Sequence, residues 1–101
     1  MTLRTIDTPR AGYIRVGMLA DPRYRLQHPV ELQVETDELG NTVVSDAFLN
    51  QYGVGETLWD ALSDYEAMLL DYYEELTTTQ EPLGPGLVEH FTYLRELIVT
   101  E

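Results

Sequence analysis

The sequence predicts an α+β fold in which a small antiparallel sheet of about three strands is covered by one or two helices. The first observation is the strict alternation of apolar and polar side chains over residues 30–36, the period of a half-buried strand. The second is the change to a helical period after residue 57, where apolar side chains recur every three or four positions. The third is size, because 101 residues with 44% hydrophobic content supply one domain with one modest core.

The expected strands lie in the first half of the chain. Residues 30–36 (VELQVET) are followed by a turn signal, DELGN, and then by residues 42–45 (TVVS), which together predict a β-hairpin. Residues 51–54 are a candidate third strand. Residues 1–28 hold five of the six arginines and two prolines, and they predict a partly irregular N-terminal segment with one strand candidate at residues 13–19. The α+β domain itself is expected over residues 29–101.

The first expected helix begins after Thr57, its predicted N-cap, with Asp60 near its positive end. The stripe expected to face the sheet consists of Leu58, Ala61, Leu62, Tyr65, Leu69, Tyr72 and Leu76. A second apolar patch of Trp59, Leu70 and Tyr73 lies about a quarter turn away, and a helix that only covers a sheet does not need it. We therefore expect another element to cover this patch.

The second expected helix follows a linker, TTTQEPLGPG, that is rich in helix-breaking residues. Its apolar stripe runs from Leu87 to Ile98 through Phe91 and Leu94. This helix is the expected cover for the second patch, either in its own chain or from a neighbouring chain.

Charge is the most unusual property of the sequence. The chain has 18 acidic residues against six arginines and no lysine, and its formal net charge is −12 at pH 7. Phosphate backbones repel such a surface, because nucleic-acid binders depend on cations that displace counterions, so direct nucleic-acid binding is not expected. A basic protein partner is the electrostatic complement. The alternative is that the acidity only keeps a small domain soluble.

The composition also indicates the compartment. The chain has no cysteine, which excludes disulfides, thiolate metal sites and thiol catalysis and fits a reducing environment. Its first residues lack the apolar block of a signal peptide, and no apolar run approaches the roughly 20 residues needed to cross a bilayer. We expect a cytoplasmic protein with no membrane association.

The stretch QYGVGETLWDAL, residues 51–62, has the two glycines of a possible phosphate-binding loop. A dinucleotide fingerprint requires a third glycine where Leu58 stands, and Glu56 places a negative charge where a phosphate would lie. A structural interpretation is favoured, in which Gly53 and Gly55 permit a sharp exit from a strand into the capped helix.

No residue pattern predicts catalysis or a bound cofactor. His28 and His90 lack the short-spaced His or Glu neighbours of a metal motif, so no metal site is expected. The carboxylates fall mainly on expected solvent faces, where they lack the burial that catalytic acids need. Tyrosine and tryptophan are favoured interface anchors, and the predicted partner-binding residues are Tyr52, Trp59, Leu70 and Tyr73.

The order of hairpin, third strand and helix entry resembles the HicB-like antitoxin family over about residues 30–75. The residues that carry the resemblance are Gly55, Glu56, Thr57, Asp60, Ala61 and Leu62, preceded by the hairpin VELQVETDELGNTVVSD. The resemblance implies a partial ribonuclease-H-like fold without nuclease activity, acting as the antitoxin of a type II toxin–antitoxin pair. The implied partner is a small basic ribonuclease. The DNA-binding unit that many members add at the C-terminus is not evident in this sequence.

Two other functions remain open at this stage. One is an acidic mimic of nucleic acid that inhibits an unrelated DNA- or RNA-binding enzyme. The other is a carboxylate-based, metal-dependent enzyme on a ribonuclease-H-like scaffold. A structural or oligomer-forming domain with no separate activity is a further alternative, and a homodimer is compatible with each of these functions.

Overall fold

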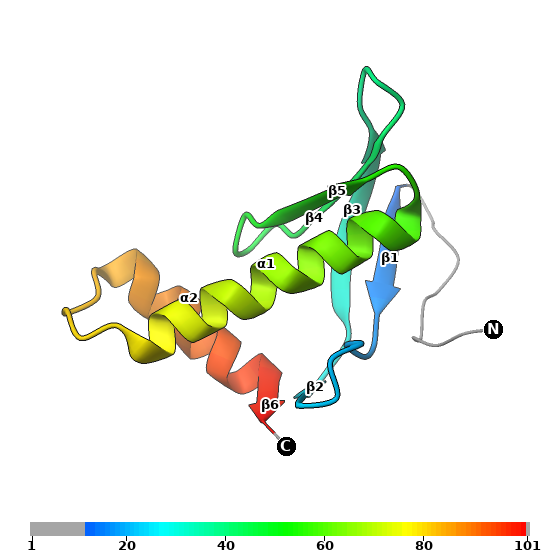
Figure 1. Ribbon diagram of the computed structural model, residues 1–101. Coiled ribbons are helices and arrows are strands. Elements are labelled where there is room, and N and C mark those ends of the chain that lie inside the picture. Colours follow the sequence, from blue (N-terminus) through cyan, green and yellow to red (C-terminus); the bar gives the residue numbers. More distant parts are fainter. Residues whose placement is uncertain (1–11, 101) are drawn as a thin grey trace.

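The computed structural model describes residues 12–100, which form two helices and two antiparallel sheets (Figure 1). The elements, in chain order, are β1 (Tyr13–Val16), β2 (Tyr24–Leu26), β3 (Val30–Thr36), β4 (Thr42–Ser45), β5 (Tyr52–Gly55), α1 (Leu58–Thr78), α2 (Pro85–Leu97) and β6 (Ile98–Thr100). The predicted α+β class is confirmed. Neither described helix is long and apolar enough to cross a membrane.

The larger sheet has four strands in the order β1-β3-β4-β5. The predicted hairpin forms its centre, and the Asp37 carboxylate stabilises the hairpin turn by accepting hydrogen bonds from the backbone N–H groups of Leu39 and Asn41, each at 2.9 Å. Gly40 in this turn has a φ of 88°, a left-handed conformation that favours glycine. The sheet has one strand more than expected, because β1, from the arginine-bearing segment, pairs with β3.

Helix α1 lies across one face of this sheet, over β5 and β4 (Figure 1). It begins as predicted, since the Thr57 hydroxyl accepts a hydrogen bond from the Asp60 N–H at 3.1 Å. The predicted stripe faces the sheet: five of its residues are buried, and the other two are partly buried against the core. The buried members are Ala61, Leu62, Tyr65, Leu69 and Leu76.

The two glycines of β5 are explained by the close approach of α1. Neither has a positive φ, so the backbone conformation does not require glycine here. A Cβ atom added to Gly53 would fall 2.7 Å from the Cα of Tyr65, and one added to Gly55 would fall 2.5 Å from the backbone nitrogen of Ala61. The absence of side chains therefore lets the strand lie directly against the helix backbone, which is a packing role rather than the conformational one expected from the sequence.

The second predicted helix is α2, but it ends one residue earlier than its apolar stripe suggested. Ile98 is the first residue of β6, which pairs antiparallel with β2 through Leu26 opposite Ile98. The β-branched run from Ile98 to Thr100 favours an extended backbone once a partner strand is present. The smaller sheet thus joins β2 to the last strand of the described chain, and Leu94, Leu97 and Ile98 belong to the same core cluster as the buried residues of α1.

Candidate protein-binding surfaces

The four residues predicted to bind a partner do not form one patch. Leu70 is buried and Tyr73 is partly buried against the core, whereas Tyr52 is 57% exposed and Trp59 is 41% exposed. Tyr52 lies on β5 and Trp59 in the first turn of α1. Tyr52 and Trp59 are therefore exposed on two different elements, whereas Leu70 and Tyr73 take part in internal packing.

The aromatic neighbour of Tyr73 is Tyr24, the first residue of β2, and not a residue of α2 as expected. The ring of Tyr24 packs edge-on against Tyr73 with 6.3 Å between ring centroids. Helix α2 instead approaches the other flank of α1, where a hydrogen bond of 2.7 Å joins the Tyr72 hydroxyl to Nδ1 of His90. Helix α1 is thus contacted by β2 on one flank and by α2 on the other.

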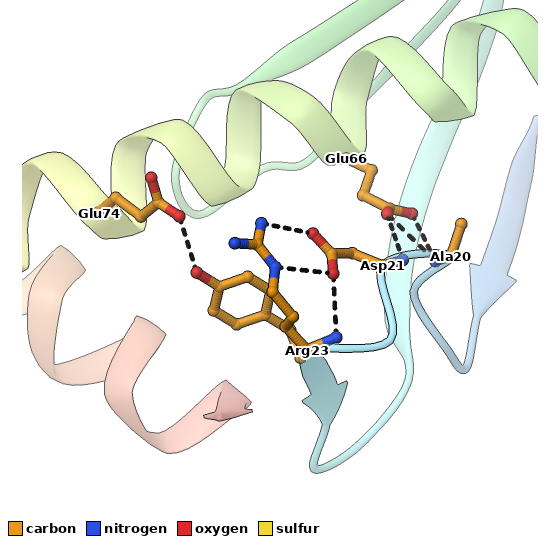
Figure 2. Close-up of polar contacts among 6 residues, drawn as sticks. Ala20, Asp21, Arg23, Glu66 and Glu74 are labelled. Atoms are coloured by element: carbon orange, nitrogen blue, oxygen red, sulfur yellow. Dashed lines mark hydrogen bonds and ion pairs between the residues drawn. The ribbon is translucent and has the colours of Figure 1, made fainter. Parts of the chain in front are cut away.

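Acidic side chains of α1 attach the segment that leads into β2, residues 20–24, to the helix (Figure 2). The Glu66 carboxylate accepts hydrogen bonds from the backbone N–H groups of Ala20, at 3.0 and 3.1 Å, and of Asp21, at 3.1 Å. Two turns further along, Glu74 accepts a hydrogen bond of 2.7 Å from the Tyr24 hydroxyl, and this bond raises the pKa of Tyr24. Within the segment, the Arg23 guanidinium donates to Asp21 and lowers the pKa of that carboxyl. These acids hold chain segments together, a role that the sequence interpretation had not assigned to them.

Replacing Glu66 with alanine is expected to lower the free energy of unfolding by about 1 to 2 kcal/mol, since hydrogen bonds from backbone N–H groups to a carboxylate are among the stronger ones. Urea unfolding followed by Trp59 fluorescence measures the change. Asp71→Ala is the matched control, because Asp71 is an exposed acid of the same helix and its removal is expected to change stability by less than about 0.5 kcal/mol. Equal effects of the two substitutions would contradict the role of Glu66.

A strip of exposed acids runs along one flank of α1. The helix contains six acidic residues and no basic residue. Five exposed positions follow one another along the helix at steps of three or four residues, namely Asp60, Asp64, Met68, Asp71 and Glu75. Asp64 also accepts a hydrogen bond of 2.9 Å from the backbone N–H of Val54 and so protects the edge of β5. We call these five positions the acidic strip.

The face of the larger sheet opposite α1 carries no helix or strand within residues 12–100. The strand register places Tyr13, Gln33, Ser45 and Tyr52 in one row across all four strands. Glu35, Val43 and Val54 form the next row on the same side, because side chains alternate between the two faces of a strand. Tyr13 is 43% exposed and Val54 is 37% exposed. We call these two rows the open sheet face; of its residues, the sequence interpretation had named only Tyr52.

The loop between β4 and β5 is organised around a buried carboxylate. Asp46 is 8% exposed and accepts hydrogen bonds from the Tyr65 hydroxyl at 2.6 Å and from the backbone N–H groups of Leu49 and Asn50. Burial, followed by the negative charge of Asp46, raises the pKa of Tyr65 far above its ordinary value. Burial and Asp46 also raise the pKa of Tyr93. The arrangement fixes the loop and leaves Tyr65 neutral throughout the physiological pH range.

The fold is expected to lose stability above about pH 10, where unfolded tyrosine ionises but Tyr65 in the folded chain does not. The pKa of Tyr65 is higher in the folded chain than in the unfolded chain. The contribution of Tyr65 to the free energy of unfolding is therefore complete below pH 10, and at higher pH it falls by at most about 1.4 kcal/mol per pH unit. The chain has no lysine, so lysine titration does not contribute to this decline. Urea midpoints measured from pH 8 upward should fall less steeply in Tyr65→Phe than in the wild type, and parallel curves would contradict the assignment.

The described histidines and acids do not form a metal cluster. Within residues 12–100 no group of three or more histidine, aspartate or glutamate side chains lies close enough to hold a metal ion. His90 contacts the rings of Tyr72 and Phe48, and His28 contacts the ring of Tyr93, so both histidines belong to aromatic clusters.

Comparisons of the chain with protein-family models, with curated proteins and with solved structures found no match. The acidic strip and the exposed apolar side chains are therefore the observations on which a functional assignment depends.

Proposed function

We propose that this protein is a non-enzymatic, antitoxin-like binding protein that neutralises a small basic protein. The observation that carries the proposal is the acidic strip of α1, where no basic residue of the helix offsets the charge. Met68, a member of the strip, is 41% exposed, and Trp59, which precedes the first acid of the strip in the sequence, is exposed to the same extent.

Electrostatics supports a basic partner. Asp60 and Asp64 lie one helical turn apart, as do Asp71 and Glu75, and like charges at this spacing destabilise a helix. A partner that brings arginine or lysine side chains to the strip removes this repulsion. It also gains speed of association, because a net charge of −12 steers an oppositely charged protein toward the surface. Trp59 then supplies apolar contact area next to the charges.

The resemblance of residues 30–75 to HicB-like antitoxins supports a toxin as the partner. The residues that carry it lie where β5 passes into α1, at the start of the acidic strip. On this proposal the partner is a small basic ribonuclease, and the antitoxin acts by covering its catalytic surface.

The test is coexpression with the small basic protein encoded beside the gene, followed by calorimetric titration of the purified pair. We expect a complex that weakens as salt is raised, because the attraction is screened. The double variant Asp71→Asn with Glu75→Gln should weaken the complex at least about tenfold, which corresponds to 1.4 kcal/mol. The control Glu89→Gln with Glu96→Gln, at two exposed acids of α2, removes the same charge elsewhere and should weaken binding less.

Two outcomes would contradict the proposal: no complex with the neighbouring protein, or a complex that is unaffected by the α1 variant. Competition experiments with short DNA and RNA identify the alternative. An acidic mimic of nucleic acid would be displaced from an unrelated nucleic-acid-binding enzyme by either polymer, whereas a toxin-specific inhibitor would bind the neighbouring protein alone.

A further inference from the structure

We infer that the tip of the β3–β4 hairpin, residues 37–41, inserts the side chain of Leu39 into an apolar pocket of the basic partner that is bordered by arginine or lysine side chains. The inference rests on the proposed function, because the partner is the same basic protein, and it adds a second contact to the acidic strip. Leu39 is 86% exposed, the highest value among the large apolar side chains of residues 12–100, where Tyr52 follows at 57%.

The hairpin tip projects beyond the rest of the larger sheet (Figure 1). The last residue pairs at this end of the sheet are Thr36 with Thr42 and Thr42 with Gly55, so the tip has no strand beside it within residues 12–100. Leu39 does not belong to the core cluster of the described residues. Nearly all of its apolar area therefore stays available for burial against another molecule.

Hydrogen bonds within the tip hold the backbone of Leu39 in place before any partner binds. Its N–H group donates to the Asp37 carboxylate at 2.9 Å. The Gly40 N–H donates to the Asp37 carbonyl at 3.1 Å, and the Asp37 N–H donates to the Asn41 carbonyl at 2.9 Å. A preformed loop loses little conformational entropy on binding, so most of the free energy gained by burying Leu39 is retained as affinity.

Charge identifies the kind of pocket. Three exposed acids, Glu35, Asp37 and Glu38, lie on the same hairpin as Leu39, and the chain has no basic residue between Arg25 and Arg95. A pocket with an acidic margin would repel this hairpin, whereas arginine or lysine side chains at the margin attract it. The same acids oppose insertion of the tip into an anionic membrane surface, which also accepts exposed apolar side chains.

The hairpin tip lies near the beginning of the acidic strip. Thr42, which follows the tip, pairs with Gly55 at the end of β5. Gly55 in turn lies so close to Asp60, the first acid of the strip, that an added Cβ atom would clash with that residue. A partner that covers the first turn of α1 is thus within reach of the tip, and one protein with an interface of ordinary size contacts both.

Calorimetric titration of the full chain with the small basic protein encoded beside the gene tests the role of Leu39. We expect Leu39→Ala to weaken the complex at least about tenfold, because the apolar area of one buried leucine is lost. Leu39→Asp adds a negative charge while it removes the apolar contact, and it should weaken the complex at least as much. The matched control is Leu87→Ala, at an exposed leucine of α2, which should change the affinity less than about threefold. Circular dichroism establishes that each variant is folded.

The absence of cysteine from the chain permits a direct measurement of insertion. In Leu39→Cys, the introduced thiol should react with a maleimide at least about tenfold more slowly when the chain is saturated with the basic protein, because a buried thiol is inaccessible. The thiol of Leu87→Cys should react at the same rate with and without the basic protein. Mass spectrometry of this chain measures both rates.

The outcomes distinguish this inference from the proposed function. If the wild-type chain forms no complex with the basic protein, both are overturned. A complex that Asp71→Asn with Glu75→Gln weakens, but that neither Leu39→Ala weakens nor protects the thiol of Leu39→Cys, would overturn the insertion of Leu39 alone. Tighter binding by Leu39→Asp than by the wild type would also overturn it, since the tip would then be held by charge and not by apolar contact.

Discussion

Replacing Gly53 with alanine is expected to destabilise the fold by about 3 kcal/mol or more. The added Cβ would lie 2.7 Å from the Cα of Tyr65 and within clashing distance of the backbone of Ala61. Both neighbours are backbone atoms of a helix, which cannot move aside as a flexible side chain can. Helix α1 would have to lift away from β5, and the core beneath it would lose contact with the sheet.

Urea unfolding followed by circular dichroism measures this effect, and Gly86→Ala is the matched control. Gly86 lies in the first turn of α2, where an added Cβ has no heavy atom within 4 Å. This substitution is expected to leave stability unchanged or to raise it by up to about 1 kcal/mol, because alanine is the better helix former. If Gly53→Ala unfolds at the same urea concentration as the wild type, strand and helix are not in the close contact described above.

Replacing Asp46 with alanine is the second large effect, with an expected loss of about 3 kcal/mol. The substitution removes the acceptor for the Tyr65 hydroxyl and for the backbone N–H groups of Leu49 and Asn50. Tyr65 and Leu49 are buried, so water does not readily replace the lost hydrogen bonds, and each unsatisfied buried donor costs about 1 to 3 kcal/mol. Equilibrium unfolding in urea measures the loss.

Two further variants separate the contributions to this loss. Asp46→Asn keeps a carbonyl oxygen for the backbone donors and is expected to cost less than alanine. Tyr65→Phe removes only the hydroxyl, so in a double-mutant cycle with Asp46→Ala the two losses should not add. Strict additivity would mean that the hydrogen bond of 2.6 Å between these side chains contributes nothing to stability.

The two proposed contacts with the basic protein lie on different elements, because the acidic strip belongs to α1 and Leu39 lies at the tip of the β3–β4 hairpin (Figure 1). Occupation of one by the partner therefore does not exclude occupation of the other. Their different salt dependence distinguishes them in one set of samples, since salt weakens the attraction between the strip and a basic protein but does not screen the apolar contact of Leu39.

Half of the predicted partner-binding residues keep an exposed position. Tyr52 and Trp59 are exposed, while Leu70 and Tyr73 pack inside the chain. The sequence places all four in apolar or aromatic positions but does not indicate which neighbour covers them. Tyr13 and Val54 were missed for the same reason, because their exposure becomes evident only when the strand register assigns each side chain to a face of the sheet.

Short-range patterns were enough to predict the hairpin, the α1 stripe and the Thr57 cap. Each depends on residues a few positions apart, so the period of the side chains and the capping chemistry determine them before any tertiary contact forms. The acidic character of the whole surface is likewise a property of composition alone.

Long-range contacts decided the rest. Ile98 continues a helical stripe in the sequence, yet it starts β6 because β2 provides a partner strand more than 70 residues earlier in the chain. Gly53 was expected to shape a turn and instead makes room for a helix backbone, and Glu66 binds a loop rather than water. In each case the deciding partner is distant in sequence, and the free energy of packing against it outweighs the local preference of the residue.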